Sequence, residues 1–250
     1  MLSTKAKHLA KQNIRALIVY WFFKITPKMD LQNAFQFLID LKFNNNRPWF
    51  KENKERYLSA KSDFDTFVES LIVLLKKQDK SIDVNSAKDC VFRIYRDARF
   101  SKNKDPYKTN FGAFISKGGR KSPYAGYYVH FEPDNSFMGG GIYQPSPDLL
   151  KSIRTQIFEN NIEYKRIIEH KDFKKQFPVL HGDKLKMAPK GFPKDFEDIE
   201  LLKNKHFVVS KKIENDIWFD RDSLKTILKS YKTQQDFNSF LNRAVGEQIR

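Results

Sequence analysis

The segment from Arg93 to Lys108 reads RIYRDARFSKNKDPYK and gathers three arginines and three lysines within sixteen residues. A guanidinium removed from water is costly unless carboxylates, carbonyl groups or a bound anion satisfy its donors. The carboxylate of Asp97 cannot match Arg93, Arg96 and Arg99 together. The surplus positive charge therefore predicts either a bound anion or acids supplied by other parts of the fold.

A strand through this segment would arrange its charges in a definite way. Successive side chains of a strand point to opposite faces, so Arg93 and Arg99 would lie on either side of Asp97. One carboxylate could then hold both guanidinium groups in the orientation that bidentate anion recognition needs. We expect an anion site formed by Arg93, Arg96, Arg99, Lys104, Tyr107 and Lys108. The alternative is an internal salt-bridge network completed by acids such as Glu52 or Asp63.

A second basic stretch, Leu185–Phe192, is loop-like and stiffened by Pro189. We expect Lys186 and Lys190 to supply a second wall of the anion site. The alternative is that both lysines face solvent, as lysines in loops commonly do.

Two residues are weak candidates for proton transfer, Asp97 within the cationic segment and His130 on a predicted strand. Whether the protein is an enzyme stays open, because a lone strand histidine is more often a structural residue. The sequence has no close cluster of His, Asp and Glu with metal-ligand spacing, and its single cysteine, Cys90, lies between apolar neighbours. We therefore predict no metal site and no cofactor.

Several motifs together resemble a known family. The pattern Arg93-x-x-Arg96-Asp97-x-Arg99-Phe100 with Lys104 and Tyr107 is similar to the signature of a bacterial and fungal family named domain of unknown function 2461. Further matching segments are Asn45–Phe50, Gly139–Gly141 with Tyr143 and Pro145, Leu185–Lys186 and Pro189–Phe192. The resemblance extends from Asp30 to Asn242. It implies relatives but no reaction, because the family has no established activity.

The composition indicates a basic globular protein with a net charge of +16 and 23 phenylalanines. Positive charge of this size suits an anionic small molecule or nucleotide, or nucleic acid contacted by aromatic residues such as Tyr124 and Tyr127. It is also typical of a surface that only maintains solubility. A protein-interaction module without chemistry is a further alternative.

The amino-terminal residues 1–28 contain six basic residues, no acid and a short apolar run, Ala16–Phe23. Eight apolar residues are too few to span a bilayer, which takes about 20. Because Met29 followed by Asp30 resembles a natural start, we expect residues 1–28 to be an upstream extension that contributes little to the fold, and residues 29–250 to form a single domain. One cysteine and no predicted membrane span favour a cytoplasmic location.

The order of predicted elements indicates an α+β fold in which a central antiparallel sheet packs with amino-terminal and carboxy-terminal helices. Apolar residues at helical spacing from Leu31 to Leu41 predict a helix that ends at 44–46, and a second helix starts at Pro48. The apolar set from Phe64 to Leu75 either extends this second helix or forms a separate one. Predicted strands are 90–95, 110–116, 124–131, 137–144 and 206–211, with a hairpin turn at 132–135. Helices are predicted from Pro147, over 195–202 and over 221–245. The glycine run at 139–141 predicts a bulge or the close approach of another backbone or a ligand.

Overall fold

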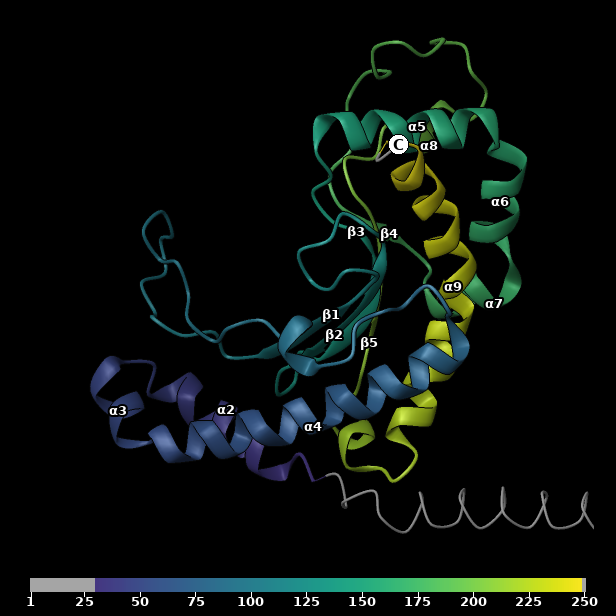
Figure 1. The fold of residues 1–250 in the computed structure, drawn as a ribbon. Helices are drawn as coiled ribbons and strands as arrows, with labels where there is room; N and C mark the ends of the chain where they lie inside the picture. Colours follow the sequence, from purple (N-terminus) through teal and green to yellow (C-terminus); the bar gives the residue numbers. More distant parts are fainter. Residues whose placement is uncertain (1–29, 249–250) are drawn as a thin grey trace, which may run out of the picture. The chain divides into compact units, whose positions relative to one another are not determined.

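The computed structural model describes residues 30–248. Its helices are α2 (Gln32–Phe43), α3 (Arg47–Glu52), α4 (Lys54–Gln78), α5 (Pro147–Glu159), α6 (Asn161–Glu169), α7 (Lys171–Gln176), α8 (Ile199–Leu202) and α9 (Ser223–Gln248), with short 3-10 turns η1 (Ala87–Asp89) and η2 (Asn215–Phe219). Its strands are β1 (Phe111–Ile115), β2 (Gly126–Phe131), β3 (Phe137–Ile142), β4 (Leu180–His181) and β5 (Phe207–Lys212). Within this part of the chain, the five strands form one antiparallel sheet in the order β1-β2-β3-β5-β4 (Figure 1). The predicted α+β fold is confirmed.

Local sequence explains where the first helices begin. Asn46 caps α3, because its side chain accepts a hydrogen bond of 3.0 Å from the backbone N–H of Trp49. Pro48 lies in the first turn of α3, where its missing N–H costs nothing, as predicted. The apolar residues from Phe64 to Leu75 continue α4 and do not form a separate helix.

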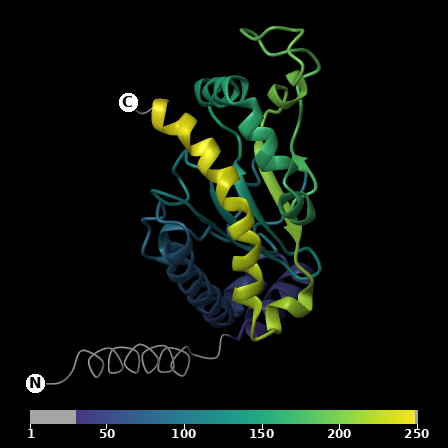
Figure 2. The ribbon, with the colours of Figure 1, turned by 90° about the vertical axis from the view of Figure 1, so that its right-hand side faces the viewer.

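The two faces of the sheet differ because side chains alternate along each strand. On one face the side chains are buried and include Ala113, Tyr127, Val129, Phe131 and Met138. Helices α4 and α9 cover this face (Figures 1 and 2). The opposite face carries partly exposed side chains such as Phe114, Tyr128, His130 and Phe137, so it remains accessible to a ligand.

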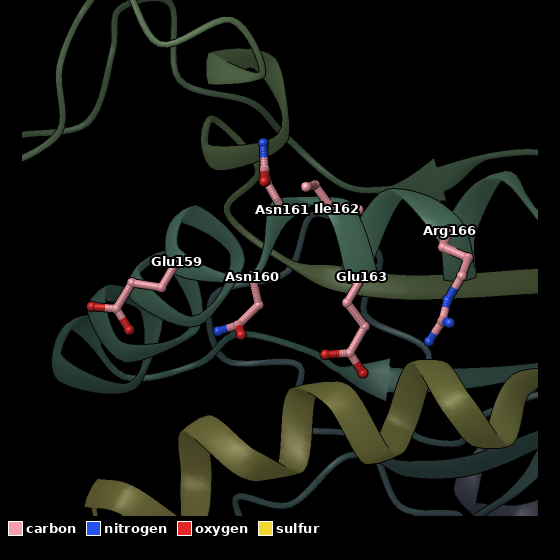
Figure 3. A pocket seen from close by; sticks show the side chains of 6 residues that line it. All are labelled: Glu159, Asn160, Asn161, Ile162, Glu163 and Arg166. Atoms are coloured by element: carbon pink, nitrogen blue, oxygen red, sulfur yellow. The ribbon is translucent and has the colours of Figure 1, made fainter.

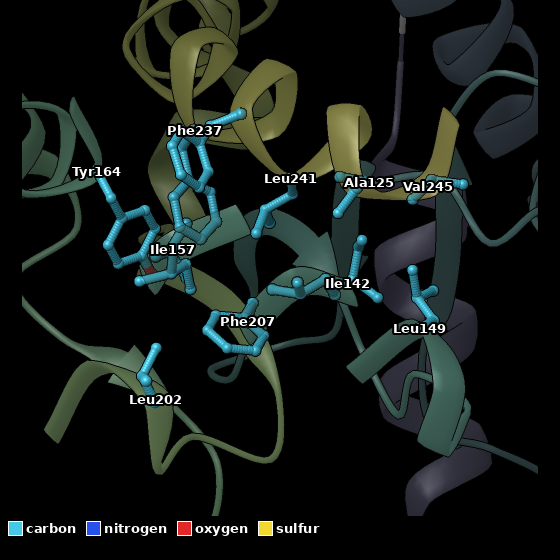
Figure 4. Packing of buried hydrophobic residues seen from close by; sticks show 14 of the residues in the cluster. Ala125, Ile142, Leu149, Ile157, Tyr164, Leu202, Phe207, Phe237, Leu241 and Val245 are labelled. Atoms are coloured by element: carbon cyan, nitrogen blue, oxygen red, sulfur yellow. The ribbon is translucent and has the colours of Figure 1, made fainter. Parts of the chain in front are cut away.

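A continuous apolar cluster joins α5 and α9 to the end of the sheet. In Figure 4, Phe237 and Leu241 of α9 lie beside Phe207 and Ile142 of the strands, with Ile157 of α5 next to them. All five are at most 4% exposed. This packing holds the carboxy-terminal helix against the sheet and positions β3 and β5.

Three sequence predictions need correction. Residues 90–95 do not form a strand: Cys90 ends η1, and the following residues make isolated bridges, Val91 with Ala113 and Tyr95 with Tyr107, with a bend at Ile94 between them. Tyr127, expected at an exposed site, is 1% exposed because its side chain points toward the helices and donates a 2.7 Å hydrogen bond to Asp79. The predicted helix at 195–202 is limited to α8, and helices α6 and α7 were not predicted.

The expectations for residues 1–28 lie outside the described residues. Within residues 30–248, each helix is too short or too polar to cross a bilayer.

Candidate functional site

A cavity of about 910 Å³ lies over the accessible face of the sheet. One row of residues crosses its floor, because the strand register pairs Phe114 with Tyr128, Tyr128 with Gly139, and Gly139 with Ser210. This row places two aromatic rings next to a glycine and a hydroxyl group. The floor therefore offers both an apolar surface and hydrogen-bonding groups to a ligand.

Connecting segments form the walls of the cavity. The β1–β2 connection contributes Arg120, Lys121 and Tyr124, and the residues that flank the arm, Phe92 and Lys108, also line the cavity. The β1–β2 connection turns sharply at Gly118 and Gly119, whose φ angles of 75° and 80° favour glycine. A hydrogen bond of 3.0 Å from the Arg120 backbone N–H to the Asp89 carbonyl oxygen holds this connection against η1.

The charged residues that line the cavity are cationic: Lys108, Arg120 and Lys121. Among residues 30–248, no carboxylate lies within ion-pair distance of any of the three, and no carboxylate lines the cavity. Lys108 is half-buried, with its Nζ 5.6 Å from the centre of the Phe92 ring. Burial lowers the pKa of Lys108, and the positive charge of Arg93 lowers it further. An anion in the cavity would stabilise the charged form of this lysine.

A hydrogen-bonded chain runs along β2 beside the cavity. The Tyr128 hydroxyl lies 3.0 Å from Nδ1 of His130, and Nε2 of His130 lies 3.1 Å from a carboxylate oxygen of Glu132. In this arrangement the imidazole donates a hydrogen bond from Nε2 to Glu132 and accepts a hydrogen bond from the Tyr128 hydroxyl at Nδ1. Burial raises the pKa of Tyr128 to about 12, and the charge of Glu132 contributes. Tyr128, which lines the cavity, thus stays a neutral hydroxyl group at pH 7.

Hydrogen bonds to Glu132 make stability depend on pH. Burial alone would raise the pKa of Glu132, but hydrogen bonds from His130, Thr109 and Asn135 outweigh it and lower the pKa to about 2. A carboxyl with a lower pKa in the folded state adds stability above its unfolded pKa, and that stability is lost as the pH falls through the folded pKa. From the ordinary value of 4.5 this amounts to about 3 kcal/mol.

We therefore expect Glu132→Gln to reduce the free energy of unfolding by about 3 kcal/mol at pH 7. The difference from the wild type should shrink as the pH falls from 4.5 toward 2, because Glu132 takes up a proton in the unfolded wild type at a higher pH than in the folded state. Urea unfolding followed across this range measures it. Glu214→Gln is the control, since that side chain is 66% exposed and should change stability by less than about 0.5 kcal/mol. A Glu132 variant that keeps wild-type stability at pH 7 contradicts the expectation.

The glycine run in β3 is explained by close packing of backbone. A Cβ atom at Gly139 would lie 1.9 Å from the Val209 carbonyl oxygen, and one at Gly141 would lie 2.0 Å from that of Phe207. These glycines also line the cavity. Approach of the neighbouring strand is therefore sufficient reason for them, and the floor they form is free of side chains.

The predicted cationic segment forms a projecting arm, here defined as residues Phe92–Lys108 (Figure 1). Near its tip Arg99 makes a two-pronged contact with Asp97, at 2.9 and 2.7 Å. Lys104 donates to the carbonyl groups of Ala98 and Arg99, and Arg96 donates to Ser101 at 3.3 Å. These contacts shape the tip of the arm. Arg96, Arg99 and Lys104 are absent from the lining of the cavity within the described part of the chain.

Tyr107 and Arg93 lie nearer the base of the arm. Asn45 holds the backbone of Tyr107 by accepting from its N–H at 3.1 Å and donating to its carbonyl at 3.0 Å. The Tyr107 ring is 6% exposed and stacks on Phe50 with centroids 3.9 Å apart, which indicates a structural role. Arg93 is exposed and close enough to Lys108 to affect its pKa. Of the eight predicted ligand-binding residues, Lys108 is thus the one that lines the cavity within residues 30–248.

The remaining predicted residues lie elsewhere. Lys186 and Lys190 are exposed in the long loop between β4 and α8, which projects at the end of the domain away from the arm (Figure 1). Asp97 is paired with Arg99 on the arm, and its side chain is 47% exposed. His130 is the proton-transfer candidate that the structure brings next to the cavity.

Sequence reasoning missed Arg120, Lys121 and Glu132. The first two lie in a loop whose path depends on the distant η1 turn, so no local pattern places them. Glu132 was assigned to the β2–β3 turn, although the alternation of Tyr128 and His130 continues to it and could have identified the hydrogen-bonded chain.

A smaller hollow of about 440 Å³ lies at the junction of α5 and α6 (Figure 3). Its lining mixes charges, with Glu159, Glu163 and Arg166 around the exposed Ile162. Glu163 is already bound by both terminal nitrogens of Arg243, at 3.1 and 2.6 Å. The larger cavity is therefore the better candidate for a ligand. In the described residues, no three His, Cys, Asp or Glu side chains gather where they could hold a metal ion.

Comparisons with curated proteins and with solved structures gave no match. A model of the family described as conserved hypothetical protein, domain of unknown function 2461, matches residues 33–240. The match includes the base of the arm, the glycine run and the hydrogen-bonded chain of β2, and it confirms the resemblance carried by the residues between Arg93 and Tyr107. The chain belongs to this family of conserved hypothetical proteins.

Proposed function

We propose that the protein binds a small molecule that carries a phosphate or carboxylate group on a flat or apolar body, such as a nucleotide. The proposed site is the cavity on the accessible face of the sheet. The observation that carries the proposal is its charge: Lys108, Arg120 and Lys121 line it without a carboxylate among the described lining residues. An oxyanion supplied by a ligand would provide the missing negative charge.

Size and surface chemistry support the same class of ligand. Cavities that bind small molecules commonly measure about 300–1,000 Å³ and are largely apolar with a few polar groups. This cavity of about 910 Å³ is within that range, and the rings of Phe92, Phe114, Tyr124 and Phe137 line it. Aromatic rings offer stacking surfaces to a base or another planar group.

If the bound molecule is also transformed, the geometry favours His130 over Asp97 as the group that moves a proton. A ligand proton could pass to the Tyr128 oxygen while the Tyr128 proton moves to Nδ1 of His130. Glu132 would then stabilise the resulting imidazolium. Asp97 lies on the exposed arm and is occupied by Arg99. The buried free thiol of Cys90 is compatible with a reducing compartment, so we place this activity in the cytoplasm.

Thermal unfolding with a panel of nucleoside monophosphates, sugar phosphates and aromatic carboxylates tests the proposal. We expect at least one class to raise the melting temperature, because a ligand that binds the native state alone stabilises it. Lys108→Ala should remove most of the increase, since losing a desolvated charge partner costs about tenfold or more in affinity. Lys102→Ala, an exposed lysine of the same arm, is the matched control. An equal increase in both variants would place the ligand outside the cavity, and no increase with any class would reject the proposal.

A further inference from the structure

The arm has a fixed position although it projects from the body of the protein. Its two sides are joined by hydrogen bonds from the Arg96 N–H to the Pro106 carbonyl at 3.0 Å and from the Lys108 N–H to the Ile94 carbonyl at 2.8 Å. The stack of Tyr107 on Phe50 secures its base to α3. Such an arm presents its tip to solvent in a defined orientation.

The tip leaves one large apolar side chain uncovered. Phe100 is 96% exposed, while the contacts around it, Arg99 with Asp97 and Lys104 with two carbonyl groups, are formed without it. The guanidinium carbon of Arg99 lies 5.8 Å from the centre of the Phe100 ring. The ring and the guanidinium therefore form one composite surface, in which Asp97 orients Arg99 and leaves its side chain 77% exposed.

Charge and aromatic residues alternate along the whole arm. The arm contains six basic residues and two aspartates, which gives it a net charge of +4. Tyr95, which is 44% exposed, lies between Arg93 and Arg96 in the sequence, and Phe92, which is 36% exposed, precedes Arg93 and also lines the cavity. Rings interleaved with cations are the surface that binds single-stranded nucleic acid, because bases stack on the rings and phosphates contact the cations.

We propose that the arm binds single-stranded nucleic acid, with a base stacked on Phe100 and neighbouring phosphates contacting Arg99 and Lys102. Arg99, Phe100 and Lys102 are absent from the lining of the cavity in the described part of the chain, so this binding at the tip does not depend on ligand binding in the cavity. An anionic membrane fits less well, because the exposed rings are spread along the arm and Phe100 alone stands fully exposed at the tip. One inserted side chain buries too little apolar surface for stable anchoring, which takes more than one such signal.

Fluorescence anisotropy of the full chain with a labelled oligothymidylate of roughly 20 nucleotides tests this proposal. Affinity should fall steeply between about 50 and 200 mM salt. Phe100→Ala should weaken binding about tenfold, because stacking supplies a large share of the affinity per base. Phe43→Ala removes a ring that is 79% exposed on α2 and should leave binding unchanged. Lys102→Ala should reduce the salt slope by about one.

Three results would overturn the proposal. The protein could fail to bind the oligonucleotide at low salt, or Phe100→Ala could bind it as tightly as the wild type does. The third result is binding to phosphatidylserine vesicles, and not to the oligonucleotide, that depends on Phe100. Comparing the two phenylalanine variants at constant charge separates stacking on the arm from general attraction to a basic protein. Circular dichroism of both variants verifies the fold. Lys108→Ala should lose the cavity ligand yet retain most of the oligonucleotide affinity, which distinguishes failure of one proposal from failure of the other.

Discussion

Gly140→Ala is expected to destabilise the protein by about 3–5 kcal/mol, a large fraction of the stability of a domain. Gly140 has a φ of 151°, and a Cβ atom there would lie 1.9 Å from the Gly126 carbonyl oxygen of the neighbouring strand. The Gln234 amide nitrogen of α9 would be 2.5 Å away. Because the nearest atom belongs to backbone, relief requires strands β2 and β3 to separate, with loss of their hydrogen bonds.

Urea unfolding followed by circular dichroism measures this cost, with Gly246→Ala as the matched control. Gly246 lies in α9 with no atom within 4 Å of an added Cβ, so alanine there should stabilise by about 0.5–1 kcal/mol. Opposite signs for the same substitution at two glycines would show that backbone approach governs β3. A Gly140 variant as stable as the wild type would contradict the strand packing described above.

Phe50→Ala should cost about 3–5 kcal/mol and also loosen the arm. Phe50 is 3% exposed and packs between Tyr107, with centroids 3.9 Å apart, and Tyr57, with centroids 5.0 Å apart. Its removal leaves a cavity at the point where the arm joins α3. The stability loss has the size typical of a buried phenylalanine, and loss of the Tyr107 stack adds a local effect.

Hydrogen exchange separates the local effect from the global one. The backbone N–H groups of Tyr107 and Lys108, which bond to Asn45 and to the Ile94 carbonyl, should exchange faster in Phe50→Ala than the global loss of stability explains. Phe43→Ala, at a ring that is 79% exposed, should change stability by less than about 0.5 kcal/mol and leave these amides unaffected. Arm amides that keep their protection relative to the β-sheet would show that Phe50 does not anchor the arm.

The parts of the fold that could be predicted are those encoded by local patterns. The β2–β3 hairpin follows from alternating side chains on both sides of the Glu132–Asn135 turn, and the helices follow from apolar spacing and from caps such as Asn46. The path of the arm could not be derived in the same way. It depends on contacts of Tyr107 with Asn45, which is 62 positions earlier in the chain.

The positive charge of the candidate site could be anticipated from the sequence better than its position in the fold could. The surplus of cations between Arg93 and Lys108 predicts either a bound anion or acids from other parts of the fold, and the structure brings Lys108 to the cavity while it pairs Arg99 with Asp97. Arg120 and Lys121 complete the cationic lining from a different loop. Sequence spacing cannot show that these segments meet, because their proximity results from the way the sheet and the helix-covered core position the loops.

Lys108 lies in the cavity as a partly desolvated cation, and we propose that an oxyanion pairs with it. Heteronuclear NMR of the lysine side chains, with Lys108 assigned through Lys108→Arg, measures its pKa with and without inorganic phosphate at constant ionic strength. The account predicts a pKa below the ordinary lysine value in chloride, because burial and Arg93 lower it, and a rise toward that value in phosphate. An ordinary pKa that phosphate leaves unchanged would contradict the claim.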